Sequence, residues 1–171
     1  VLTTISKFAF YNCTGINGDI IIPQSLTTIG DRAFEGTRIE GHILLRTSIT
    51  TLGKRAFART KITDLTIYRN IPESTFEGVD TLKTLYVNGA SDRIEIDANA
   101  FKDCTISDVM EFDNAEIKTD AFYGASYTNK GSNARLYFID STIGSYAFRK
   151  FIMSDTLINI TDTTISDYAF E

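Results

Sequence analysis

Residues 9–34 read Ala-Phe-Tyr-Asn-Cys-Thr-Gly-Ile-Asn-Gly-Asp-Ile-Ile-Ile-Pro-Gln-Ser-Leu-Thr-Thr-Ile-Gly-Asp-Arg-Ala-Phe. The stretch begins and ends with the dipeptide Ala-Phe and carries an aliphatic run between the two copies. The same pattern continues to the end of the chain, with anchoring phenylalanines 19 to 26 residues apart. These anchors are Phe10, Phe34, Phe57, Phe76, Phe101, Phe122, Phe148 and Phe170. A recurring period of this length is typical of solenoid proteins.

Two further positions recur with each anchor. Alanine precedes the phenylalanine in every repeat except the fourth, where Thr75 stands. Five positions before the anchor the residue is always aliphatic: Ile5, Ile29, Leu52, Ile71, Ile96, Ile117, Ile143 and Ile165. A unit of this size cannot close an apolar core alone, so copies must stack and share one.

An aliphatic-x-aliphatic pair follows each anchor by about ten residues. The pairs are Ile20/Ile22, Ile43/Leu45, Leu65/Ile67, Leu85/Val87, Met110/Phe112, Leu136/Phe138 and Ile158/Ile160. Alternation with period two predicts short strands buried on one face. We expect a predominantly β solenoid of α/β type: a single right-handed, curved stack of about seven coils with a parallel sheet on one face. Turns, with room for single helical turns at the Ala-Phe pairs, would form the opposite face.

The position two residues after each anchor predicts tight turns. Asn12, Gly36, Gly78, Asp103 and Gly124 are residues that tolerate a left-handed backbone. Arg59 and Lys150 interrupt this pattern, so the turn geometry need not be identical in every coil. The longest repeat contains a polar stretch, residues 126–133, that we expect to protrude as a loop.

Composition excludes several classes of function. The chain has 171 residues, is 43% hydrophobic and has a net charge of −5 without a basic stripe. Nucleic-acid binding depends on Lys and Arg that neutralise phosphates, so no nucleic-acid partner is expected. The longest purely aliphatic run, residues 20–22, is far too short for a transmembrane segment.

Catalytic and metal-binding chemistry has little support. Cys13 and Cys104 both stand three residues after an anchor, which predicts small buried side chains. They lie four coils apart, about 19 Å at the usual interstrand spacing, so we expect unpaired thiols. His42 and Asp64 occupy equivalent strand positions, but a nucleophile to complete a triad is missing. A solvated histidine is the better interpretation, and we expect no catalytic residue, metal or cofactor.

The outward strand positions give the best candidate site. Residues between or just after the buried pairs would line up on one face of the sheet, and several are aromatic or charged. Tyrosine and arginine are enriched in protein-binding hot spots. The candidate partner-binding residues are Leu44, Arg46, Thr66, Tyr68, Tyr86, Glu111 and Tyr137. The alternative, that these residues reflect β-propensity alone, remains open.

The stretch 9–34 resembles the BspA-like leucine-rich repeats, and the likeness persists in more degenerate form to residues 169–170. The resemblance implies a leucine-rich repeat solenoid in a cell-surface or secreted protein, associated with adhesion and protein binding. It carries over no catalytic residue, because the defined positions of the motif belong to core and turns. We expect one domain over residues 1–171, part of a longer surface protein.

Two functions compete. The first is a surface module that recognises a protein or glycan of a host or neighbouring cell through the strand face. The second is a structural spacer without a ligand of its own. Terminal coils of a solenoid expose a core edge, so end-to-end or edge self-association is a further expectation.

Overall fold

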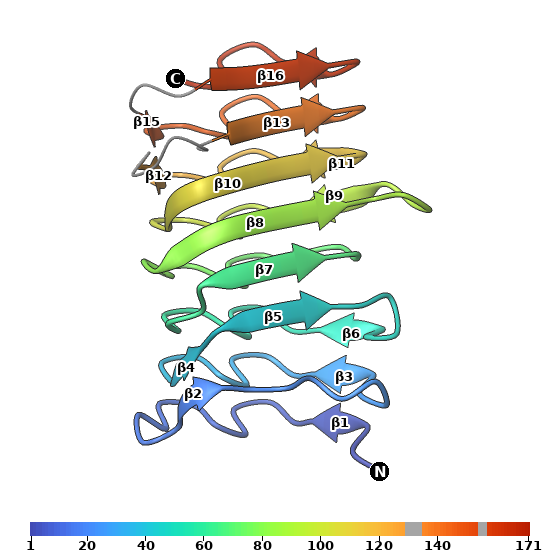
Figure 1. The fold of residues 1–171 in the computed structure, drawn as a ribbon, viewed down its shortest axis with the longest axis vertical. Coiled ribbons are helices and arrows are strands. Elements are labelled where there is room, and N and C mark those ends of the chain that lie inside the picture. Colours follow the sequence, from blue (N-terminus) through green and yellow to red (C-terminus); the bar gives the residue numbers. More distant parts are fainter. Residues whose placement is uncertain (129–134, 154–156) are drawn as a thin grey trace.

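The computed structural model describes residues 1–128, 135–153 and 157–171. These residues form a β-solenoid of about seven turns in which every strand pair is parallel (Figure 1). The solenoid expected from the repeat is therefore confirmed. Within the described ranges no segment is helical, and the Ala-Phe positions lie in turns.

The strands are short, because each coil contributes only a few residues to each side of the solenoid. In the first four coils they are β1 (Thr4–Ile5), β2 (Asn17–Asp19), β3 (Thr28–Ile29), β4 (Arg38–Glu40), β5 (His42–Leu45), β6 (Thr51–Leu52), β7 (Asp64–Ile67) and β8 (Leu82–Asn88). The remaining coils contain β9 (Ile94–Ile96), β10 (Thr105–Asp113), β11 (Ala115–Ile117), β12 (Ser126–Tyr127), β13 (Arg135–Ile139), β14 (Thr142–Ile143), β15 (Ile152–Met153), β16 (Leu157–Thr161) and β17 (Thr164–Ile165).

The longest sheet holds the predicted aliphatic pairs. Its strands follow one another as β5, β7, β8, β10, β13 and β16, with β12 and β15 pairing beside the first residues of β10. From β5 to β13 both members of each pair are buried. The first pair, Ile20/Ile22, lies outside the strands, and Ile160 on β16 is half exposed because no coil of the structure covers it.

A second series of parallel strands runs along another side of the solenoid. Strands β1, β3 and β6 form one part, and β9, β11, β14 and β17 form the other. Each includes the aliphatic residue five positions before an anchor, and a bridge between Ile71 and Ile96 continues the column. We expected turns opposite the long sheet. Strands form on this side too, because β-branched pairs such as Thr28-Ile29 favour extended backbone.

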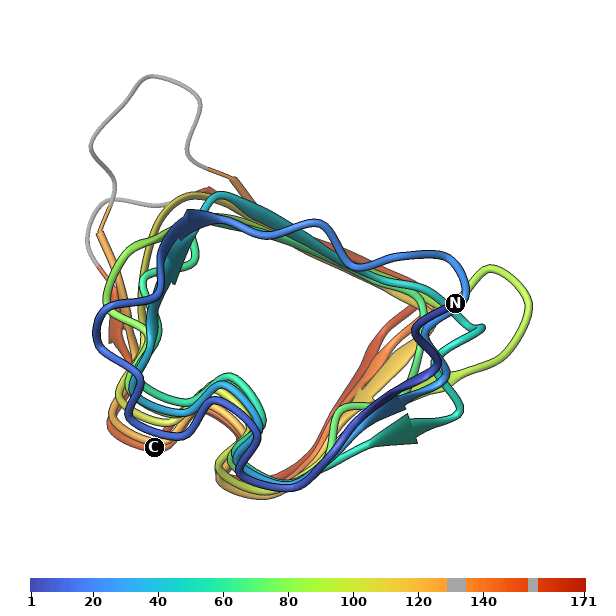
Figure 2. The same cartoon turned by 90° about the horizontal axis from the view of Figure 1, so that it is seen from below.

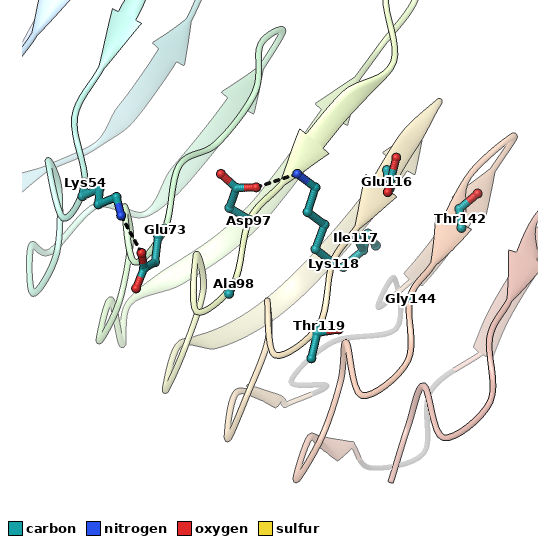
Figure 3. A pocket seen from close by; sticks show the side chains of 10 residues that line it. All are labelled: Lys54, Glu73, Asp97, Ala98, Glu116, Ile117, Lys118, Thr119, Thr142 and Gly144. Carbon is teal, nitrogen blue, oxygen red and sulfur yellow. Dashed lines mark hydrogen bonds and ion pairs between the residues drawn. The ribbon is translucent and has the colours of Figure 1, made fainter.

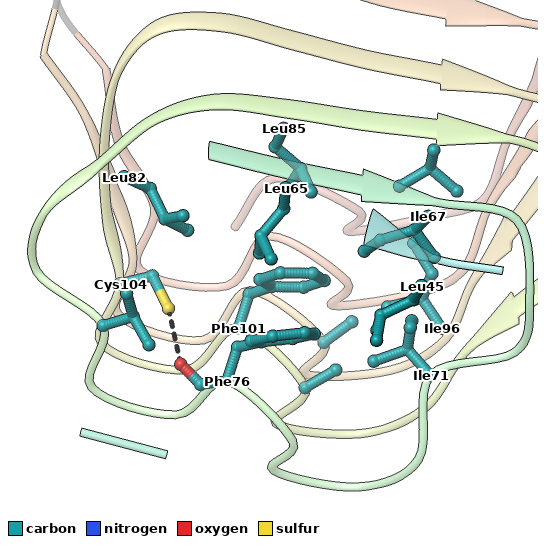
Figure 4. Close-up of a cluster of buried hydrophobic side chains, with 14 of the residues drawn as sticks. Leu45, Leu65, Ile67, Ile71, Phe76, Leu82, Leu85, Ile96, Phe101 and Cys104 are labelled. Atoms are coloured by element: carbon teal, nitrogen blue, oxygen red, sulfur yellow. Dashed lines mark hydrogen bonds between the residues drawn. The ribbon is translucent and has the colours of Figure 1, made fainter. Parts of the chain in front are cut away.

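The anchoring phenylalanines form a continuous stack through the core. Consecutive rings lie 4.8 to 5.6 Å apart between centroids and are nearly parallel from Phe10 to Phe170. The amide of each anchor from Phe10 to Phe148 donates to the carbonyl that precedes the next anchor, at 2.8 to 2.9 Å. Figure 4 shows the rings of Phe76 and Phe101 beneath the aliphatic residues of the long sheet. This spine fixes the register of successive coils.

The turns around the anchors are the same in every coil. Residues two positions after the anchor all have φ between 55° and 74°, including Arg59 at 57° and Lys150 at 58°. Arg59 and Lys150 therefore adopt the same turn as the residues that favour a left-handed backbone at this position. Residues two positions before the anchor also have positive φ in all eight repeats, and none is glycine. Hydrogen bonds between coils hold this backbone, as when the Arg59 amide donates to the Glu77 carbonyl at 2.9 Å.

Two sequence expectations need correction. Cys104 is buried as predicted, but Cys13 is exposed, because the coil that carries it has a neighbour on one side only. Both thiols are free, as expected. Of the polar stretch 126–133, Ser126 and Tyr127 belong to β12, and the Tyr127 side chain is fully buried. Residues 129–133 of that expected loop lie outside the described part of the chain.

Candidate functional site

Five of the seven candidate residues form one straight row on the outer face of the long sheet. Strand register pairs each with the next, in the order Leu44, Thr66, Tyr86, Glu111 and Tyr137. Arg46 and Tyr68 begin a second row two residues further along their strands, which continues through Asn88, Asp113 and Ile139. The spacing of the repeats alone thus identified side chains that are neighbours in space.

These side chains differ in how much of their surface they offer. Tyr68 and Tyr86 are exposed, at 41% and 38%. Leu44, Thr66, Glu111 and Tyr137 are half-buried by their neighbours in the row. Arg46 is also half-buried, and its guanidinium reaches back to the Ile22 carbonyl at 3.5 Å. The aromatic part of the face is therefore its most accessible part.

A hollow of about 400 Å³ lies within the row, lined by Tyr86, Glu111, Tyr137, Val109 and Arg135. The two tyrosines are both register partners of Glu111, so their backbones are two strands apart, about 9.6 Å. Val109 and Arg135 pair with one another two residues before Glu111 and Tyr137 of the row. Sequence reasoning considered positions between and after the buried pairs and missed these two, which precede them. The sequence feature that could have identified Val109 and Arg135 is their position in the repeat, which is the same as that of His42 and Asp64.

Tyr68 lies apart from that hollow. It faces two other depressions, of about 60 and 400 Å³, at the corner where the chain leaves the long sheet. Asp92 lines both depressions, and residues 89–93 form an excursion there that is visible as the green loop in Figure 2. The candidate residues therefore divide into a central hollow around Glu111 and a corner site around Tyr68.

His42 and Asp64 do not form a catalytic pair. They are register neighbours, but His42 Nε2 lies 2.9 Å from Thr66 Oγ1. The Asp64 carboxylate instead accepts hydrogen bonds from the hydroxyls of Thr63 at 2.7 Å and Thr84 at 2.5 Å. The histidine is exposed, in agreement with a solvated side chain.

A hollow of about 500 Å³ lies on the second series of strands and was not predicted (Figure 3). Its charged side chains are largely paired with one another. Lys54 contacts Glu73 at 2.7 Å, and Lys118 contacts Asp97 at 2.8 Å and Glu95 at 2.5 Å. The hydrogen bonds that the Lys118 ammonium donates to Asp97 and Glu95 raise the pKa of Lys118. This mutual pairing indicates that the charged side chains form ion pairs between neighbouring coils and do not form a binding site for a charged ligand.

In the part of the chain that the structure describes, neither a metal site nor a membrane-spanning helix can be assigned. Within the ranges that the structure describes, His, Cys, Asp and Glu side chains do not gather in threes around a common point. The same ranges contain no helix with the length and apolar character needed to cross a membrane.

A stack of short parallel strands around a phenylalanine spine defines a repeat protein of the solenoid class, which is typically a scaffold without enzymatic activity. The BspA type leucine-rich repeat region matches residues 3–130 in six copies. The chain therefore belongs to the BspA-type leucine-rich repeat family. Comparisons with curated proteins and with solved structures give no match.

Proposed function

We propose that the chain is a binding module of a surface or secreted protein, and that it recognises a protein or glycan partner through the outer face of the long sheet. The observation that carries the proposal is the row of aligned side chains with a hollow between Tyr86 and Tyr137. The module has no catalytic role in this proposal and forms one domain over residues 1–171. Leucine-rich repeats of this type generally mediate interactions, which supports the proposal.

The chemistry of the hollow suits recognition. Tyrosine offers a large apolar surface with a polar tip and loses little conformational entropy when a partner covers it. Glu111 and Arg135 add one charge of each sign at the same place, which can orient a partner through hydrogen bonds. β-Propensity alone accounts for tyrosines on a sheet, but it does not require that they enclose a hollow with charged residues.

A triple variant tests the proposal. Alanine at Tyr68, Tyr86 and Tyr137 removes the aromatic surface while leaving the buried face of the strands untouched. Because truncation of even one hot-spot residue costs about 2 kcal/mol or more, binding should fall by at least about 30-fold. The measurement is capture of extracellular proteins and arrayed glycans by the immobilised chain, followed by affinity determination for the captured partner.

A matched control keeps the number of tyrosine substitutions comparable. Tyr11 and Tyr168 are exposed on the turns, away from the long sheet, so alanine at both should leave binding unchanged. Circular dichroism establishes that each variant keeps its fold. Full binding by the folded triple variant rejects the assigned face. A wild-type face that captures neither protein nor glycan favours the spacer function instead.

A further inference from the structure

The corner site around Tyr68 is built from the same part of three successive coils. Residues 46–50 follow β5, residues 68–70 follow β7 and residues 89–93 follow β8 (Figure 2). The two depressions of about 60 and 400 Å³ share Thr47, Tyr68 and Asp92 in their linings, so they adjoin at Tyr68. Sites for small ligands typically have volumes of about 300–1,000 Å³, and the larger depression falls in this range.

The excursion of residues 89–93 forms one wall of the corner, and hydrogen bonds to the next coil hold it. The Gly89 amide donates to the Asp113 carbonyl at 2.8 Å, and the Ile94 amide donates to the Asn114 carbonyl at 3.0 Å. The side chain of Asn114 also donates to the Gly89 carbonyl at 2.6 Å. Because both ends of the wall are bonded before a ligand arrives, less conformational entropy is lost when a ligand binds.

Two side-chain amides at the corner have donors to offer. Asn70 Oδ1 accepts a hydrogen bond from the Glu95 amide at 2.9 Å, and Asn88 Oδ1 accepts one from the Ala90 amide at 3.0 Å. These bonds fix the planes of the two amides. Among the described residues their NH₂ groups have no partner, so both remain available as donors.

The charged groups of the corner offset one another without pairing. The ion pairs formed between described residues include neither Arg69 nor Asp92. Arg69 is held by the hydrogen bond that its Nε donates to the Asn70 carbonyl at 3.1 Å. Arg93, which also lines the larger depression, lies 3.8 Å from Glu116. The corner thus presents a carboxylate acceptor and several donors with little net charge, which suits a neutral polar ligand.

Tyr68 supplies the apolar surface of the corner. Its ring is 41% exposed, whereas the aliphatic residues that line the larger depression, Ile49 and Ile94, are each only 2% exposed. The face of an aromatic ring carries partial negative charge and attracts C–H groups, which carry partial positive charge. The corner therefore presents a flat ring beside hydrogen-bonding groups and not a recess for an aliphatic side chain.

These features favour a sugar over a peptide. A pyranose ring has C–H groups on its faces and neighbouring hydroxyls on its rim, and each hydroxyl both donates and accepts hydrogen bonds. An extended peptide that adds to a sheet needs a free strand edge. Strand β7, which leads into Tyr68, is paired on one side with β5 and on the other with β8, so it has no free edge.

We propose that this corner binds a neutral hexopyranose unit of a glycan, with the Tyr68 ring against a C–H face of the sugar. Asn70 and Asn88 donate hydrogen bonds to its hydroxyls, and Asp92 accepts hydrogen bonds from them. This inference rests on the proposed function, because it assigns the glycan class of partner to one part of the strand face. The central hollow around Glu111 is not required for it.

The test is a titration of the isotope-labelled chain followed by amide NMR signals. The probes are the methyl glycosides of β-galactose, α-mannose and β-glucose, together with galacturonic acid and the peptide acetyl-Ser-Gly-Ser-amide. We expect at least one glycoside to shift the signals of residues 68–70 and 88–92, with a Kd on the order of 1 mM for a ligand of this size. Galacturonic acid should bind no more tightly than the glycosides, and the peptide should leave these signals in place.

Substitutions identify the groups that hold the sugar. Tyr68→Ala removes the ring and should weaken binding at least about tenfold, whereas Tyr68→Phe keeps the ring and should change binding less than about twofold. Asp92→Asn removes the charge that strengthens the accepted hydrogen bonds, so it should weaken binding severalfold. The matched control is Tyr86→Ala, which removes a ring of similar exposure from the same sheet outside the corner and should leave sugar binding unchanged.

Several results overturn the inference. Signals that stay in place with all three glycosides reject a sugar site, and equal weakening by Tyr68→Ala and Tyr86→Ala rejects this corner as its location. Tighter binding of galacturonic acid or of the peptide rejects a neutral sugar as the ligand.

A double variant separates this inference from the function proposed for the whole face. Tyr86→Ala with Tyr137→Ala disrupts the central hollow and should leave the affinity for the glycoside unchanged. A chain that captures a partner through the central hollow but binds no glycoside rejects the sugar site alone. A chain that binds the glycoside at the corner but captures neither protein nor glycan rejects the recognition role of the face and keeps the sugar site.

Discussion

Truncating one ring in the middle of the phenylalanine stack should cost most of the stability of the chain. Phe101 is fully buried and stacks on Phe76 at 5.3 Å and on Phe122 at 4.8 Å. Phe101→Ala removes a buried aromatic side chain, which typically costs about 3–5 kcal/mol, and it interrupts the stack on both sides. A domain of this size is stable by only about 5–15 kcal/mol, so the variant should be close to unfolding.

The same substitution at Phe170 gives the comparison. This ring is 40% exposed and has one parallel neighbour, Phe148 at 4.8 Å. Because less surface is buried and less cavity is left, Phe170→Ala should cost about 1–2 kcal/mol.

Urea denaturation followed by circular dichroism measures both losses. The difference between them tests the spine directly, since both variants make the same chemical change. Losses that agree within about 0.5 kcal/mol would show that the stack does not act as the common core of the coils. Phe101→Leu, which refills most of the volume, should recover a large part of the lost stability.

Three further predictions concern the turns and the buried polar groups. Arg59→Gly should stabilise the chain by about 1 kcal/mol, because a non-glycine residue at φ 57° is strained. Gly78→Ala should destabilise the chain by a similar amount, because Gly78 also has a positive φ, although its new Cβ would meet nothing closer than 3.4 Å. The same urea assay measures both changes. Burial raises the pKa of Cys104 from 9.0 to about 12, so its contribution to stability is complete below pH 9 and is lost as the pH rises toward 12. The free energy of unfolding should therefore fall more steeply with alkali in wild type than in Cys104→Ala, and a thiol reagent at neutral pH should modify Cys13 alone; early loss of both thiols contradicts the assignment. Tyr127→Phe should cost about 1–2 kcal/mol, since the buried hydroxyl donates to the Asp108 carbonyl; an unchanged urea midpoint counts against that bond.

The architecture follows from the sequence because every coil carries apolar residues at the same positions, and these residues must be buried. The column that contains Ile29 and Leu52 and the stack that contains Phe34 and Phe57 are buried where the spacing places them. Local exceptions mislead: Arg59 adopts the glycine-like turn because hydrogen bonds to the adjacent coil hold its backbone, whatever its side chain prefers.

The candidate site was partly predictable for the same reason. Alternation along the strands placed Tyr86, Glu111 and Tyr137 in one row, and the register confirms it. Arg135 was missed because it precedes the buried pair Leu136/Phe138, whereas the candidates were drawn from positions between and after the pairs.

Extra residues of the longer coils leave the spine unchanged. The rings of Phe76 and Phe101 remain 5.3 Å apart although residues 89–93 project between the two long strand series. Because the hydrogen bonds that align the coils occur in the turns and strands, an engineer can graft a foreign peptide between Asn88 and Ile94 and display it on a rigid frame. Each coil offers such an attachment point at the same corner, so several peptides can be held at spacings fixed by the stack.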